Sequence, residues 1–247
     1  MGRVLITGDT HGNADFGFSK FSSKKFPEGR HLTKDDYMII LGDFGLPWRI
    51  DKFGNPCDEE KYLMKWLHEK KWTTLFIDGN HENFDYLDSL PIEEKFGGKV
   101  QRINDSIFRL CRGEIFEIHN KKIFVFGGGQ SVDKDRRIQG VSWWPQEIPS
   151  HQEMEYAYFN LEKHNFQVDY ILTHVAPLAL MRTILETGAY YDPYHEAKTI
   201  DPVSKFLDMI SVEHIEGFKH HYFGHYHIDR RIEYKFTALY RNIIELI

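Results

Sequence analysis

Short apolar runs alternate with longer amphipathic stretches along most of this chain, a pattern that favours an α/β fold. The runs are brief and rich in β-branched or aromatic residues, so they indicate buried strands rather than helices. The predicted strands cover 4–6, 38–41, 74–77, 123–126, 170–172 and 222–223. The stretches between them predict helices over 58–69, 83–90, 151–163 and 202–212, and 231–247 alternates enough to add one or two further strands.

The chain has 247 residues and shows no internal repeat, low-complexity tract or linker, so we expect a single domain over 1–247. The formal charge of −6 predicts no bulk attraction to nucleic acid or acidic membranes. Two cysteines, Cys57 and Cys111, are too few for a disulfide framework or a cysteine zinc site. No run has the length of a membrane span, and the first predicted strand leaves no room for a signal peptide, so the expected location is the cytoplasm.

Acid, Asn and His residues follow five of the predicted strands. The motifs are Gly8-Asp9-Thr10-His11-Gly12, Gly42-Asp43, Gly79-Asn80-His81-Glu82, Thr173-His174 and Gly224-His225-Tyr226-His227. Ordinary turn chemistry explains any one of them, because Asp, Asn and Gly are common after strands. Ligands collect at the carboxyl ends of strands in α/β sheets, however, so all five loops are predicted to converge on one site.

The residue types predict that this site holds two metal ions. Asp9 and His11 are two positions apart, which places both side chains on the same side of an extended segment, and His225 and His227 repeat this spacing. Imidazole and carboxylate suit Mn, Fe, Zn or Co. We assign one ion to Asp9, His11, Asp43 and His227, and the other to Asp43, Asn80, His174 and His225. Asp43, which stands alone in its motif, is the expected bridge.

Two divalent ions, two aspartates and one bridging hydroxide leave a residual positive charge that attracts a phosphate ester. A metal pair can hold the attacking hydroxide while it neutralises the phosphoryl oxygens. His81 directly follows Asn80, so its side chain is expected to point away from the metal and toward substrate, as a general acid or a phosphate-orienting donor. The predicted reaction is therefore phosphate-ester hydrolysis by a metal-bridging hydroxide.

In this order, the five motifs resemble the calcineurin-like metallophosphoesterases. The resemblance implies a four-layer αββα sandwich, a dinuclear centre in which Mn is the first expectation and Fe, Zn, Co or Ni are alternatives, and His81 as the catalytic histidine that binds no metal. Ser/Thr protein phosphatases of this family carry Arg-Gly after the second motif, where this chain has Phe44-Gly45-Leu46. They also lack a final His-x-His pair of this kind, so the protein-phosphatase alternative is disfavoured.

The segment 127–147 resembles one in a bacterial and phage-type branch of that family. It predicts one side of the substrate-binding site, in which Arg137 binds phosphate beside Asp133. Trp143 and Trp144 are expected to form an apolar or base-stacking face of the same site. The alternative is an ordinary loop, made possible by its glycines, that precedes an aromatic element of the surface or core. Asn13 is a further candidate for phosphate contact, although a turn residue is as reasonable.

The predicted function is a phosphoesterase that favours phosphodiesters over monoesters. Its expected substrate is a phosphorylated small molecule, a nucleotide or a nucleic-acid end, and no obligate protein partner is evident. Two alternatives stay open: an atypical Ser/Thr-type protein phosphatase, and a metal-binding scaffold for a partner protein. Every motif position is filled, which disfavours the scaffold.

Overall fold

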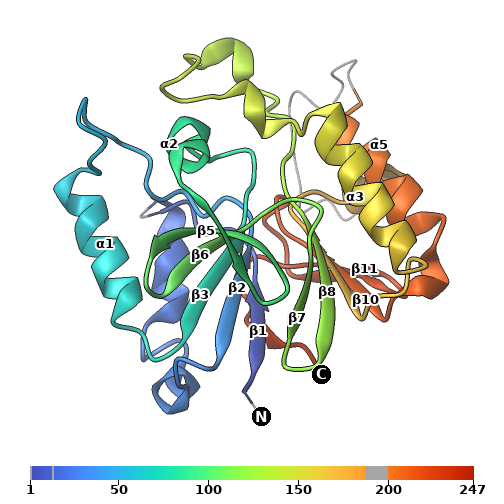
Figure 1. Cartoon of the computed structure of the whole chain (residues 1–247), viewed down its shortest axis with the longest axis horizontal. Helices are drawn as coiled ribbons and strands as arrows, with labels where there is room; N and C mark the ends of the chain where they lie inside the picture. The colour runs from blue at the N-terminus through green and yellow to red at the C-terminus, as the bar shows by residue number, and fades with distance from the viewer. Residues whose placement is uncertain (1, 13, 187–199) are drawn as a thin grey trace.

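The computed structural model describes residues 2–12, 14–186 and 200–247. Two β-sheets lie face to face, and helices cover the outer face of each (Figure 1). Within the described residues, no helix is both long enough and apolar enough to cross a membrane.

The first sheet has seven strands in the order β13-β1-β2-β3-β6-β5-β4. Its strands are β1 (Val4–Thr7), β2 (Tyr37–Leu41), β3 (Thr73–Ile77), β4 (Ile92–Lys95), β5 (Gly98–Asn104), β6 (Ile107–Leu110) and β13 (Ile244–Glu245). The four central strands β1, β2, β3 and β6 run parallel, and antiparallel pairs add β13 at one edge and β5 and β4 at the other.

The second sheet has six strands in the order β11-β12-β10-β9-β8-β7. Its strands are β7 (Ile115–Ile118), β8 (Lys121–Phe126), β9 (Tyr170–Thr173), β10 (His220–Phe223), β11 (Arg230–Glu233) and β12 (Phe236–Ala238). The inner strands β8, β9, β10 and β12 are parallel, and β7 and β11 pair antiparallel at the two edges.

The described residues form five α-helices: α1 (Asp58–His68), α2 (Phe84–Ser89), α3 (His151–Lys163), α4 (Met181–Glu186) and α5 (Pro202–Leu207). Helix α1 lies beside the first sheet, and α3 and α5 lie beside the second (Figure 1). The start of α3 is fixed by a capping box, in which Ser150 accepts from the backbone of Glu153 and the Glu153 side chain accepts from Ser150.

Three apolar clusters separate the four layers. The strands are buried on both faces, so alternate residues of one strand enter different clusters. In β8, Ile123 and Val125 join the cluster between the sheets, whereas Phe124 and Phe126 pack under α3 and α5. Residues Met38 and Ile40 of β2 pack outward in the same way, against the cluster that includes Leu67 of α1. The predicted αββα sandwich is confirmed.

The six predicted strands and four predicted helices are all present, although the last helix ends at Leu207 and continues as a π-helical turn over Asp208–Val212. Strands β4 to β7 were not predicted. Each of them takes part in an antiparallel pair, although β6 also pairs parallel with β3. Strand β4 reads Ile-Glu-Glu-Lys and lies largely exposed at a sheet edge, so it carries no apolar run. The C-terminal stretch contains parts of three strands rather than one or two, because β13 returns to the first sheet.

Candidate metal centre

The five motifs meet at one end of the sandwich, where the parallel strands of both sheets have their carboxyl ends. Asp9 and Asp43 lie two residues beyond β1 and β2, and Asn80 lies three residues beyond β3. His174 directly follows β9, and His225 lies two residues beyond β10. Two sheets therefore supply one site.

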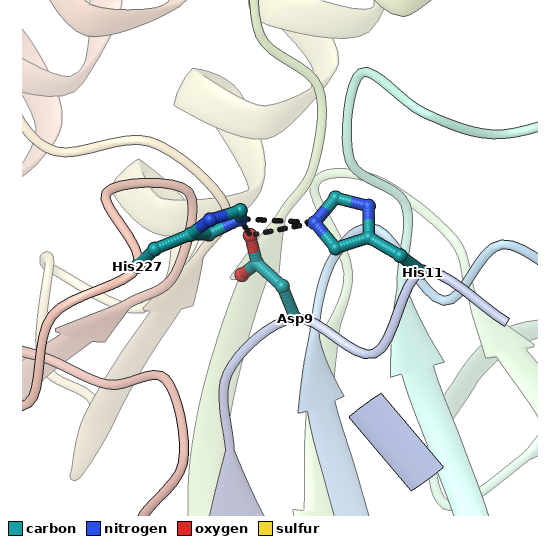
Figure 2. A group of neighbouring side chains, drawn as sticks. All are labelled: Asp9, His11 and His227. Carbon is teal, nitrogen blue, oxygen red and sulfur yellow. Dashed lines mark hydrogen bonds and ion pairs between the residues drawn. The ribbon is translucent and has the colours of Figure 1, made fainter. Parts of the chain in front are cut away.

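The first group of converging side chains is Asp9, His11 and His227 (Figure 2). The Nε2 atoms of His11 and His227 are 2.9 Å apart. Asp9 Oδ2 lies 3.1 Å from His227 Nε2 and 3.7 Å from His11 Nε2. One carboxylate oxygen and two imidazole nitrogens thus point at a common space.

The second group is Asp43, His174 and His225, joined by Asn80. His174 Nε2 lies 3.4 Å from Asp43 Oδ1, 3.3 Å from His225 Nδ1 and 3.0 Å from Asn80 Oδ1. The other ring nitrogen of His174 is 2.8 Å from the carbonyl oxygen of Leu41. An Nδ1–H that donates to this carbonyl leaves Nε2 as the acceptor, which is the form needed for metal binding.

Asp43 lies between the two groups. Its Oδ2 is 3.7 Å from His11 Nδ1, and its Oδ1 faces His174 and accepts a 2.7 Å hydrogen bond from the backbone N–H of His81. Burial by itself raises the pKa of Asp43, but the charges of His174, His81 and His11 outweigh it and hold this pKa below its usual range. The Asp43 carboxylate is therefore kept ionised.

Four of the nine described non-glycine residues with positive φ are residues of these motifs. His11, Asp43, His225 and His227 have φ values of 48°, 47°, 65° and 52°, in the left-handed region that side chains other than Gly rarely adopt. A strained backbone conformation is retained only where the surrounding contacts hold it in place, and such conformations are common at functional sites.

At two of the motif glycines, a carboxylate lies so close to the backbone that there is no room for a Cβ atom. A Cβ at Gly79 would lie 2.1 Å from Asp43 Oδ1, and a Cβ at Gly224 would lie 2.4 Å from Asp9 Oδ1. Each carboxylate therefore packs directly against the backbone of another motif, which explains why glycine precedes Asn80 and His225.

Three buried residues that hold the loops were given no role in the sequence analysis. Glu82 accepts hydrogen bonds from the backbone N–H groups of Phe44, Gly45 and Gly79, and so ties the loop of Asp43 to that of Asn80. Asn80 Nδ2 donates to Ser131 Oγ at 3.1 Å, and Ser131 Oγ lies 2.5 Å from Glu147 Oε2. Glu82 stands inside the third motif, whereas only tertiary contact reveals the other two.

His81 and Arg137 face one another at the mouth of this site. Arg137 Nη2 lies 3.4 Å from His81 Nε2. Arg137 is held by Asp133, whose Oδ1 accepts from Nε at 2.7 Å, and by the carbonyl oxygen of Ser142 at 3.1 Å. Burial lowers the pKa of His81, against the opposing charge of Asp43. Asp133 thus contacts Arg137, and the Asn13 candidate lies outside the described residues.

A cavity of about 660 Å³ opens beside the first group. Its described lining consists of His11, Gly12, Gly45, Leu46, Trp48, Arg49, Glu59, Glu60, Leu63, His81, Arg137 and His227. The predicted tryptophan face needs correction: Trp144 is only 3% exposed and neither it nor Trp143 is part of that lining. Trp144 instead packs perpendicular to Trp48, with ring centroids 5.2 Å apart, because its segment folds inward behind the cavity wall.

Comparison with known proteins agrees with the geometry. No curated protein matches the sequence. One similar solved structure, a Staphylococcus aureus protein described as a 5′-nucleotidase in complex with α-ketoglutarate, is 14% identical with a TM-score of 0.48. That match covers 98% of this chain, which spans about half (49%) of the other. The family model for calcineurin-like phosphoesterases matches residues 2–229, and the chain therefore belongs to this family of phosphate-ester hydrolases.

Proposed function

We propose that the protein is a dinuclear metal-dependent phosphoesterase that favours phosphodiesters. The observation that carries this proposal is the position of Asp43, whose two carboxylate oxygens face His11 in one donor group and His174 in the other. A shared carboxylate is what two neighbouring ions require.

The donor set fits divalent metal ions. Asp9 Oδ2 is buried, and imidazole nitrogens of His11 and His227 point toward it. A buried carboxylate charge is costly unless a cation lies beside it. One ion would be held by Asp9, His11, Asp43 and His227, and the other by Asp43, Asn80, His174 and His225. Carboxylate, amide and imidazole ligands support Mn as the first candidate, with Fe, Zn, Co and Ni as alternatives.

When bound, such an ion pair supplies a water of lowered pKa and neutralises charge on the phosphoryl oxygens. Arg137 is placed to bind a phosphate oxygen, because its guanidinium is fixed by Asp133 and Ser142 while Nη2 points to His81. His81 lies between Arg137 and the donor groups, so it is positioned to orient the phosphate and to pass a proton to the leaving oxygen.

The preference for diesters is supported by the extent of the cavity. Its lining runs from His81 and His227 to Leu63 on α1, which leaves room for a second ester group beyond the phosphate.

The proposed location is the cytoplasm. The two free thiols, Cys57 and Cys111, agree with a reducing cytoplasmic environment.

The test is turnover by metal-free protein refilled with Mn²⁺, with bis-p-nitrophenyl phosphate and p-nitrophenyl phosphate compared side by side. Diester cleavage that is lost in His81→Ala, with both ions retained, is the expected result. Cleavage of the monoester alone would make the protein a phosphatase. Two bound ions without turnover of either ester would favour a scaffold, and turnover of phosphopeptides alone would favour a protein phosphatase.

A further inference from the structure

The cavity beside the donor groups has two chemically different ends. The end next to the metal ligands carries Arg137, His81 and His227, which suit an anion. The far end is lined by Leu46, Trp48 and Leu63 together with Arg49, Glu59 and Glu60.

The charges at the far end are paired with one another. Arg49 Nη2 lies 2.6 Å from Glu59 Oε2, and Arg49 Nε lies 3.4 Å from Glu60 Oε1. The buried Glu60 carboxylate also accepts from the backbone N–H groups of Trp48 and Arg49. One arginine and two glutamates leave a formal excess of one negative charge there, which does not attract a second phosphate, and the apolar side chains suit an uncharged group.

Trp48 is held firmly at this end. Its backbone N–H donates to Glu60 at 3.0 Å, and its carbonyl oxygen accepts from Asn83 Nδ2 at 2.7 Å. Asn83 is only two residues from His81, so the backbone of Trp48 is tied to the loop that carries the catalytic histidine. The Trp144 ring packs against the Trp48 indole at a right angle.

We propose that Trp48 forms a binding subsite for a planar aromatic group, such as a nucleobase, carried by the phosphate ester. Trp48 is the tryptophan in the described cavity lining, and aromatic rings stack on bases whatever the identity of the base. A cavity of about 660 Å³ has the size of a small-molecule site. This inference rests on the proposed function, because the phosphate of the same ligand lies between Arg137 and the donor groups.

The test compares two ligands that differ only in the planar group. Hydrolysis-resistant phosphonate analogues of adenosine 5′-monophosphate and of ribose 5-phosphate are titrated calorimetrically into the Mn²⁺-loaded protein. The nucleotide analogue should bind on the order of 5- to 100-fold more tightly, which is the range that stacking on one aromatic residue supplies.

Three variants test whether Trp48 causes the difference between the two affinities. Trp48→Leu should bring the ratio of the two affinities close to one, and Trp48→Phe should keep most of it. Trp66→Leu, a half-buried tryptophan of α1 outside the described cavity lining, is the matched control and should leave the ratio unchanged. Thermal melting of each variant verifies that it is folded.

A ratio near one in the wild-type protein, or a ratio that survives in Trp48→Leu, would overturn the subsite. These outcomes are separate from failure of the proposed function, since binding is measured without turnover. Hydrolysis of bis-p-nitrophenyl phosphate with no preference for the adenosine analogue would leave the enzyme assignment standing and remove only the aromatic subsite.

Discussion

Ser131 fixes the direction in which the side-chain amide of Asn80 points. The Ser131 hydroxyl has one proton, and Glu147 Oε2 lies 2.5 Å from its oxygen. The hydroxyl donates to this buried carboxylate and is therefore the acceptor for Asn80 Nδ2, at 3.1 Å. The amide oxygen of Asn80 must then face the opposite way, toward His174. Segment 127–147 thus orients a proposed metal ligand as well as supplying Arg137.

This chain of hydrogen bonds predicts that Glu147→Gln weakens metal binding at the second donor group. A glutamine amide can donate to Ser131 Oγ and so free the hydroxyl to turn toward Asn80, which removes the fixed orientation of the Asn80 amide. Loss of such a supporting partner typically weakens metal affinity by roughly 10- to 100-fold. Calorimetric titration with Mn²⁺ should show one weakened ion and one unchanged ion.

Glu155→Gln is the matched control, because Glu155 is exposed on α3 and pairs only loosely with His151, at 3.5 Å. Equal weakening of both ions in Glu147→Gln, or no weakening at all, would contradict the orienting role of Glu147.

Asp43→Asn should release both ions together. The substitution removes the charge that faces both donor groups, since one oxygen of Asp43 faces His11 and the other faces His174. Asp9→Asn is the informative comparison, because Asp9 belongs to the first group alone and its loss should spare the second ion. Metal content measured by elemental analysis after desalting checks both variants. Full occupancy of one ion in Asp43→Asn would exclude the bridging position.

His81→Ala should keep both ions while turnover falls about 10²- to 10⁴-fold, the range for loss of a positioned acid–base group. The His81 ring faces Arg137, whereas only its backbone N–H contacts Asp43. His151→Ala, at an exposed position of α3, serves as the control. If His81→Ala also loses metal, the residue supports the ligands and is not a catalytic group.

Apart from β6, the sequence predicted the central parallel strands, the main helices and the convergence of the five motifs, because these strands are short apolar runs and five of them end near a polar ligand type. It did not predict which side chains support the site. Glu82 stands within the third motif, but its contacts, like those of Ser131 and Glu147, join segments far apart in the chain, and no local pattern marks such contacts. The tryptophan face was assigned to Trp143 and Trp144, but the described cavity lining contains Trp48 instead, and Trp144 is buried against Trp48.

Removal of metal should lower the melting temperature. Without ions, Asp9 and Asp43 are two buried carboxylates, and burial of a charged carboxylate costs free energy that a bound cation offsets. Binding of an ion to the folded state alone stabilises that state by about 2.7 kcal/mol per site when its free concentration is 100 times its Kd. The melting temperature should therefore be lowest in EDTA and should rise steadily with the Mn²⁺ concentration. A melting temperature indifferent to Mn²⁺ would argue against ion binding at this site.

Asp78→Asn should destabilise the fold through a buried ion pair beneath the site. Asp78 is fully buried; its Oδ1 lies 2.9 Å from Arg109 Nη2 and its Oδ2 accepts from Arg112 Nε at 2.7 Å. Removal of the shared carboxylate leaves two buried guanidinium groups without their main partner, which costs about 3–5 kcal/mol. Urea unfolding in the presence of EDTA measures this loss apart from metal binding. Asp88→Asn is the control, because Asp88 is half exposed and such pairs contribute at most about 1 kcal/mol.

The same contact predicts how stability depends on pH. Burial raises the pKa of Asp78, but Arg112 and Arg109 outweigh burial and hold this pKa below its usual range. A carboxyl whose pKa is lower in the folded state stabilises the fold above its unfolded pKa, near 4, and the contribution is lost as the pH falls toward the folded pKa. Asp78→Asn lacks this group, so its free energy of unfolding should fall less steeply than that of the wild type below about pH 4. Parallel slopes for the two proteins would mean that Asp78 does not contribute to acid unfolding.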